Sequence, residues 1–259
     1  MASGYDDFPA YVPVAQRLAN GRRALEKLAK KRGRPLAPIT LDSRHIATSF
    51  WGRAWCQHLE THSDFASRLP RGRTYVRNGS VLDLHIEHGK VEAHVAGSSL
   101  YEVTIKLTKL EDARWRQIIA ACSGRIASLI GLLRGELAAD VLSVLTDRKA
   151  GLFPAPKEIH MLCTCPDSAY MCKHVAAVLY GVGARLDRSP ELFFLLRQVD
   201  QAELIASAVA ADVLTVAGAR SGGSGRRRLA TSAIASVFGI ELEPEQAEVS
   251  KKKTRKPPR

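Results

Sequence analysis

The chain has 259 residues, of which 46% are hydrophobic and 25% are charged, the composition of an ordinary globular protein with a packed core. No run approaches the roughly 18 apolar residues of a membrane span, and the polar stretch 1–8 lacks the apolar region of a secretory signal, so we expect a cytoplasmic protein without membrane contact. The net charge of +12, with 38 Lys and Arg against 26 Asp and Glu, favours a polyanionic partner.

Residues 1–40 are predicted to form an extended segment followed by a basic helix. Pro9 and Pro13 favour extended or turned backbone at the start. Residues 14–32 then carry an imperfect apolar stripe, and Gly33 and Pro35 end the pattern. The basic residues of this helix are Arg17, Arg22, Arg23, Lys27, Lys30, Lys31 and Arg32. Its charged face either contacts phosphates or is simply solvated.

Residues 41–110 are predicted to form a helix and a small antiparallel meander. The helix covers 49–60, and its Trp51 and Trp55, one turn apart, are expected in the core rather than in base stacking. Asn78-Gly79 is typical of a hairpin turn, which makes 74–77 a candidate strand before it. Period-two alternation predicts the other strands at 81–86, 91–95 and 100–107.

The remaining segments complete an α+β fold. Residues 111–156 are predicted to be helical and to end in a Gly/Pro linker, and residues 187–217 to form C-terminal helices. The composition of residues 218–259 is that of a flexible basic tail. We therefore expect a small antiparallel sheet with several helices, plus a metal-stapled strand–turn–helix module at 157–186.

Three of the five cysteines cluster with one histidine. Cys163 and Cys165 end a plausible strand, where residues two apart point to the same face. Cys172 and His174 follow after a turn and run into an apolar helical stretch. Three thiolates and one imidazole suit tetrahedral zinc, so one ion is expected to tie the strand to the helix.

With four protein ligands the zinc site is closed and is therefore expected to be structural rather than catalytic. The ion and three thiolates carry a charge near −1, which Lys173 and the start of the following helix would offset. The alternative interpretations are a chance cluster of buried side chains or a redox-active Cys-x-Cys pair.

The Cys-x-Cys…Cys-x-His arrangement resembles the SWIM zinc finger, a family named after chromatin-remodelling ATPases and plant transposases. The chain to about residue 200 also resembles bacterial SWIM-containing proteins, on the strength of residues 5–9, 50–56 and 68–79. The resemblance implies that Cys163, Cys165, Cys172 and His174 hold the zinc. It also suggests DNA or protein binding in concert with a helicase-like remodelling ATPase.

A second candidate site is an arginine-rich segment. Its members are Arg68, Arg71, Arg73, Tyr75 and Arg77. If 74–77 is a strand, Arg73, Tyr75 and Arg77 share one face that could grip phosphates and stack a base. The alternative is a charged strand edge that protects against aggregation.

No phosphate-loop, hydrolase or paired-carboxylate signature occurs in the sequence, so we expect a binding protein rather than an enzyme. The first hypothesis is a nucleic-acid-binding zinc protein, with DNA favoured. The alternative is a protein-interaction adaptor that uses the zinc-stapled module without contacting nucleic acid. The sequence does not decide between DNA and RNA, the base specificity or the oligomeric state.

Overall fold

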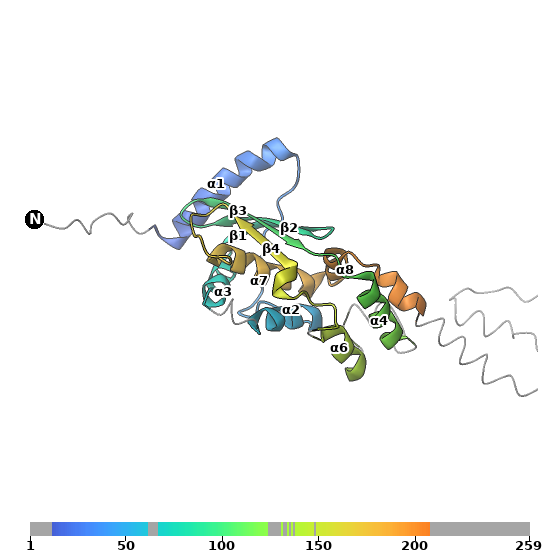
Figure 1. The fold of residues 1–259 in the computed structure, drawn as a ribbon. Helices are drawn as coiled ribbons and strands as arrows, with labels where there is room; N and C mark the ends of the chain where they lie inside the picture. The colour runs from blue at the N-terminus through green and yellow to red at the C-terminus, as the bar shows by residue number, and fades with distance from the viewer. Residues whose placement is uncertain are drawn as a thin grey trace, which may run out of the picture. The chain divides into compact units, whose positions relative to one another are not determined.

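A computed structural model of the chain describes residues 12–61, 67–123, 131, 134, 136, 138–147 and 149–207 (Figure 1). They form an α+β fold, as the sequence predicted. The helices are α1 (Val14–Arg32), α2 (Phe50–Glu60), α3 (Leu69–Arg77), α4 (Asp112–Cys122), α6 (Ala139–Thr146), α7 (Lys173–Arg188) and α8 (Glu191–Arg197). The strands are β1 (Val81–Glu87), β2 (Lys90–Ala96), β3 (Leu100–Leu107) and β4 (Ile159–Cys163).

The four strands form one antiparallel sheet in the order β1-β2-β3-β4. The meander β1–β3 confirms the predicted alternation, and β4 from the metal-motif region pairs with β3, with Val103 opposite Cys163. The free edge of β1 is covered by an extended segment, because Ile39 donates to the carbonyl of Val81 and Leu84 donates to that of Ala37. The metal-motif strand is therefore part of the main sheet.

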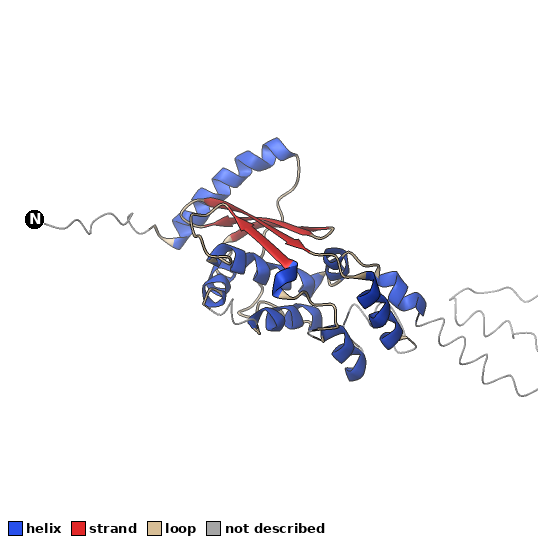
Figure 2. Cartoon of the chain, in the orientation of Figure 1, coloured by secondary structure: helices blue, strands red, loops and turns tan. Residues whose placement is uncertain are grey.

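Helices cover the two faces of the sheet unequally (Figures 1 and 2). On one face lies α1, which packs Leu25 against Leu82 and Ala96 in a small apolar cluster. The other face carries the main core, centred on α7, in which every residue from His174 to Ala184 is buried. The predicted basic helix thus forms over its full expected length and rests on the sheet.

The tryptophans of α2 are core residues, as expected. Trp51 and Trp55 have no exposed surface, and the indole Nε1 of Trp55 donates to the carbonyl of Leu179 at 2.8 Å. Their rings contact Phe193, which also stacks on Phe153 with centroids 4.8 Å apart. Replacing such a buried tryptophan by alanine costs about 3–5 kcal/mol.

The expected strand at 74–77 is wrong, because this segment is the second half of helix α3. Pro70 occupies the first turn, where it lacks only a hydrogen bond that the helix does not use. Leu69, Gly72 and Val76 are buried at helical spacing. An added Cβ on Gly72 would lie 2.5 Å from the Cβ of Ala176, so the glycine lets α3 pack closely on α7. Gly79, with φ 69°, follows the C-terminus of the helix and terminates it, so Asn78-Gly79 is not the turn of a hairpin.

The described part of the chain contains no helix long and apolar enough to cross a membrane. Several predicted features lie outside the described residues: the extended segment at 1–11, much of 123–138 and the tail at 218–259. The helical pattern predicted from 201 onward is observed as far as residue 207.

Candidate metal centre

The first two candidate ligands are positioned by the end of β4. Cys163 is its last residue and lies on the inward face, while Leu162 points outward and is 69% exposed. Thr164 continues the pairing with β3: its N–H donates to the carbonyl of Glu102, and its Oγ1 accepts from the N–H of Glu102. The backbone bends at Thr164, directly after the strand, and the Sγ atoms of Cys163 and Cys165 lie within 4.8 Å of each other.

The other two candidate ligands belong to the start of α7. Cys172 is the N-cap of the helix, and its Sγ accepts a hydrogen bond from the N–H of Val175 at 3.5 Å. His174 lies in the first turn. Both side chains are buried, with 1% and 3% of their surfaces exposed. The helix start therefore presents a thiolate-stabilising N–H and an imidazole to the end of β4.

The geometry fits one tetrahedral ion. One ligand atom from each of Cys163, Cys165, Cys172 and His174 lies within 4.8 Å of all the others. The Nδ1 of His174 is 3.9 Å from the Sγ of Cys163 and 3.8 Å from that of Cys172. Zinc bonds of about 2.3 Å to sulfur and 2.0–2.1 Å to nitrogen place tetrahedral ligands roughly 3.6–3.8 Å apart. The four residues could hold one zinc ion.

The close packing of the three thiols couples their protonation. The pKa of Cys172 is lowered to about 3, first by the hydrogen bond from Cys163 and then by those from His174 and the N–H of Val175. The pKa of Cys163 is raised, chiefly because it holds that shared proton and also because it is partly buried. Burial is likewise the main cause of the raised pKa of Cys165. Without a cation, the cluster therefore favours a single thiolate, and zinc would stabilise all three.

Two tyrosines and a glycine enclose the histidine. The ring of Tyr101 stacks on that of His174 with centroids 4.4 Å apart, and Tyr75 meets it edge-on at 5.4 Å. A Cβ at Gly97 would lie 2.8 Å from the Nε2 of His174, so only glycine leaves room for the ring. These packing residues were not predicted from the sequence, because they come from β3, α3 and a turn, and only the fold brings them together.

Comparison with known proteins agrees with this geometry. The profile of the SWIM zinc finger family matches residues 162–182, which span all four ligands. The chain carries a SWIM zinc finger. In the SWIM zinc finger of this protein the first two candidate ligands lie at the end of β4 and in the bend after it, and the last two at the N-cap and in the first turn of the central helix α7. The finger is therefore built into the hydrophobic core.

One relative extends the similarity beyond the finger. The uncharacterized protein Rv2102 of Mycobacterium tuberculosis (strain ATCC 25618 / H37Rv) is 31% identical over 169 residues, which cover 64% of this chain and 61% of the relative. The match thus spans less than two thirds of the length of that protein. No solved structure matches the chain significantly.

The residues of the arginine-rich segment do not share one face. In α3, Arg73 and Arg77 are one turn apart on one side, whereas Tyr75 lies on the other side and packs against His174. Arg68 forms an ion pair with Asp167 in the turn between the second and third ligands. Arg71 is exposed and makes no ion pair with a described residue. The expected stacking of a base on Tyr75 is therefore replaced by a contact that supports the metal site.

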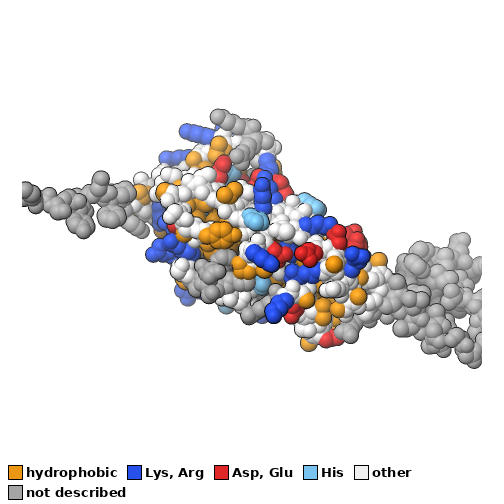
Figure 3. Space-filling view, in the orientation of Figure 1, with side chains coloured by type: hydrophobic (Ala, Val, Ile, Leu, Met, Phe, Trp, Pro, Cys, Tyr) orange, Lys and Arg blue, Asp and Glu red, His pale blue; other side chains and the backbone are white. Residues whose placement is uncertain are grey.

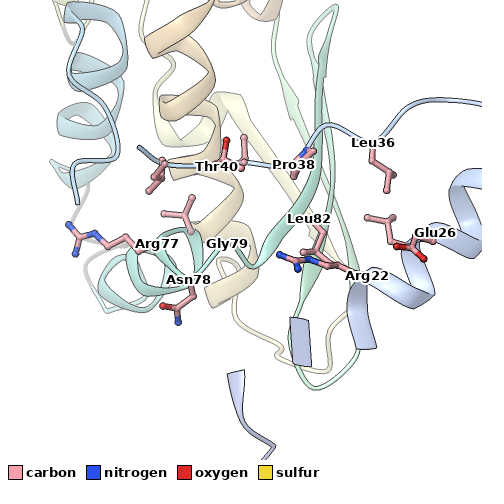
Figure 4. Close-up of a pocket in the computed structure, with 13 residues that line it drawn as sticks. Arg22, Glu26, Leu36, Pro38, Thr40, Arg77, Asn78, Gly79 and Leu82 are labelled. Carbon is pink, nitrogen blue, oxygen red and sulfur yellow. The ribbon is translucent and has the colours of Figure 1, made fainter. Parts of the chain in front are cut away.

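A hollow of about 530 Å³ lies between α1, α3 and the segment that covers β1 (Figure 4). Leu36, Pro38 and Leu82 line it, together with other aliphatic side chains. Arg22 extends into the space from α1, while the guanidinium of Arg77 points away from it. No aromatic side chain lines the hollow, so it offers charge and aliphatic surface rather than a stacking platform.

Proposed function

We propose that this protein is a nucleic-acid-binding protein of the cytoplasm, with DNA the favoured partner, in which the SWIM zinc finger is structural and non-catalytic. The closed four-ligand set supports a structural role, because it leaves no coordination position for a substrate or an activated water. The role of the finger would be to hold β4 and α7 together. The contacts with phosphates would come from basic side chains outside the finger.

The observation that carries the proposal is the charge on the outer face of α1. Its inner face packs on the sheet through Leu18, Gly21 and Leu25. The outer face exposes the basic side chains of Arg23, Lys27 and Lys30, and Arg22 is exposed at its edge beside the hollow. Figure 3 shows Lys and Arg side chains over α1. The helix has a single acidic residue, Glu26, so little of this charge is neutralised within it. A helix whose exposed basic side chains form no ion pair with the described residues is suited to phosphate contacts that release counterions.

A helicase-like remodelling ATPase is proposed as the protein that would act with it. This part of the proposal rests on the resemblance to SWIM-containing proteins and on the absence of any phosphate-loop motif in the chain itself. A protein that binds nucleic acid without hydrolysing ATP needs a separate motor for remodelling. Co-purification with such an ATPase from the native organism, abolished by chelation of zinc, is the expected result.

The direct test measures nucleic-acid affinity against salt. The zinc-loaded protein is titrated against labelled single-stranded DNA, duplex DNA and RNA by fluorescence anisotropy at several salt concentrations. We expect submicromolar binding at low salt, with affinity that falls steeply as salt rises. Replacing Arg22, Arg23 and Lys27 by glutamine should weaken binding about tenfold or more and reduce the log–log salt slope by roughly 2–3, since each lost phosphate contact removes about 0.7–0.9.

The matched control replaces Lys109, Arg116 and Lys149, three exposed basic residues outside α1, by glutamine. Both triple variants lower the net charge by the same amount, so a difference between them reports the position of the charges rather than their number. Equal losses in the two variants would mean that α1 has no special role. No binding to any polymer at low salt would refute the proposed function.

A second candidate function, the protein-interaction adaptor, is favoured by two exposed apolar side chains beside the zinc finger. Leu162 is 69% exposed on β4, and the ring of Tyr170 is held by a hydrogen bond from its hydroxyl to the carbonyl of Ile159 while the residue stays 61% exposed. Partly exposed apolar groups of this kind are common in docking surfaces. If Leu162→Ser abolishes capture of the ATPase but leaves DNA affinity unchanged, the adaptor function is supported.

A further inference from the structure

A small hollow of about 170 Å³ lies on the side of α3 that carries Arg73 and Arg77. Arg53 of α2 and His45 of the preceding segment also line it, and Glu60 and Tyr180 form part of its wall. Three arginines from two helices and one histidine therefore line one space, with Glu60 the sole carboxylate among the lining residues. The hollow is open to the surface, so a group attached to a large molecule can enter it.

The carboxylate is already engaged with its neighbours. The Oε1 of Glu60 accepts a hydrogen bond from the Tyr180 hydroxyl at 2.8 Å and lies 3.2 Å from a terminal nitrogen of Arg73. The guanidinium of Arg73 also lies over the Tyr180 ring, 5.5 Å from its centroid. These contacts neutralise one positive charge and hold Arg73 in place. Among the described residues, no carboxylate pairs with the guanidinium groups of Arg53 and Arg77.

The donors that remain face no protein acceptor among the described residues. The Nε of Arg73 is buried and has no hydrogen-bond partner there. Arg77 uses its Nε to donate to the carbonyl of Arg44 at 3.1 Å, while its two terminal nitrogens bind none of the described groups. Arg53 is exposed and likewise makes no side-chain hydrogen bond or ion pair with the described part of the chain. An anion would supply acceptors to all three.

We propose that Arg53, Arg73 and Arg77, with His45, form a phosphate-binding pocket that receives a backbone phosphate of the nucleic acid. The planar fork of arginine matches the oxygens of a phosphate group, and the space is of the right order for one such group. The guanidinium of Arg73 lies over the ring of Tyr180, the one tyrosine among the lining residues, so that ring face is not free to stack a base. The pocket therefore positions the strand without reading its bases.

The neighbouring hollow supports a polymer as the source of the phosphate. Arg77 lines both spaces, and Arg22 of α1 reaches into the second one (Figure 4). The phosphate pocket thus lies beside a hollow that is lined on its other side by the basic helix on which the proposed function rests. This inference depends on that function for the identity of the ligand, whereas the pocket could also hold the phosphate group of a small molecule.

The test uses the double variant Arg53→Gln/Arg77→Gln in the zinc-loaded full chain. Its charge-matched control is Arg116→Gln/Lys149→Gln, at two exposed positions outside the pocket. Anisotropy titrations with single-stranded and duplex DNA should show binding at least tenfold weaker than wild type for the pocket variant. The control variant, which loses the same net charge, should bind less than twofold more weakly than wild type. The salt slope should fall by roughly 1–2. Arg53→Gln alone, at an exposed position, keeps the test valid if the double variant unfolds.

A second arm uses inorganic phosphate alone. The unfolding midpoint is measured in phosphate and in chloride at equal ionic strength, and the extra stabilisation by phosphate is expected in the wild type and the control but not in the pocket variant. If DNA binds and the pocket variant equals the control in both arms, the pocket is refuted and the proposed function stands. If DNA does not bind but phosphate stabilises only the intact pocket, the pocket is supported for a small phosphate ligand and the nucleic-acid function fails.

Discussion

The zinc finger and the arginine-bearing helix α3 are both connected to α7, but in different ways. The finger includes the start of α7, whereas α3 packs against the side of that helix. Two of the candidate zinc ligands, Cys172 and His174, are buried at the N-cap and in the first turn of α7. The arginines at the start of α3 and along it are at least partly exposed, and those that form ion pairs have a single carboxylate partner, as Arg68 does with Asp167 and Arg73 with Glu60. The finger is therefore expected to bind zinc and fold cooperatively, so that loss of one ligand removes the whole site. Each substitution in the basic surface should instead lower stability or affinity by a small, independent amount.

The largest expected effect is the loss of one zinc ligand. Cys172→Ser removes both a ligand and the thiolate that caps α7, and it leaves the other thiolates without a cation. Structural zinc contributes about 10–16 kcal/mol in isolated finger peptides, and loss of a metal is among the few single changes that cost more than about 4 kcal/mol. We expect loss of zinc, measured by elemental analysis, together with a collapse of the thermal unfolding transition.

The control for this variant is Cys56→Ser, at a half-buried thiol outside the metal site. Burial is the main cause of the raised pKa of this thiol, so it is not a ready metal ligand. The Cys56→Ser variant should keep one zinc per chain. A Cys172→Ser protein that retains one zinc and unfolds like the wild type would show that the finger is not the cooperative unit described above.

An intermediate effect is expected from Gly97→Ala. The new methyl group would lie 2.7 Å from the Tyr101 ring and 2.8 Å from the Nε2 of His174, so it must displace the ligand or its packing partner. Overpacking of this kind costs about 1–3 kcal/mol, and disturbance of the surroundings of a ligand lowers metal affinity about 10–100-fold. Competition with a chromophoric zinc chelator measures the change.

Ser99→Ala is the control because this residue belongs to the same turn and is exposed. It should bind zinc as tightly as the wild type. Wild-type affinity in both variants would mean that the histidine ring tolerates displacement, and the tight enclosure of the ligand would then have no energetic role.

The smallest effect is expected from Arg68→Gln. This change breaks the 3.5 Å ion pair with Asp167 in the turn between Cys165 and Cys172, and both partners are about one third exposed. Ion pairs at such positions contribute roughly 0–1 kcal/mol and are screened by salt. We expect a stability loss of less than about 1 kcal/mol in urea denaturation and an unchanged zinc content. A large loss of zinc would mean that the ion pair holds the ligand-bearing turn, and the two regions would then be coupled.

Much of the fold was predictable because its signals are local. The helix at 14–32 and the strands β1–β3 follow from apolar periodicity, and these elements form where the pattern placed them. The strand at 74–77 was wrong because Asn78-Gly79 is a strong hairpin signal, whereas the competing helical spacing of Leu69, Gly72 and Val76 is short. That spacing becomes decisive only when α7 is present for Gly72 to pack against.

By itself the sequence determined the metal chemistry, because the type and spacing of Cys163, Cys165, Cys172 and His174 specify a zinc site before any contact is known. Only the tertiary structure decided the surroundings of that site and of the arginines. It joined β4 to the meander, turned Tyr75 toward His174, and brought Arg53 of α2 beside Arg73 and Arg77 of α3. The reason is physical: metal ligation depends on a few donor atoms close in sequence, whereas packing and charge convergence depend on segments that meet only in the folded core.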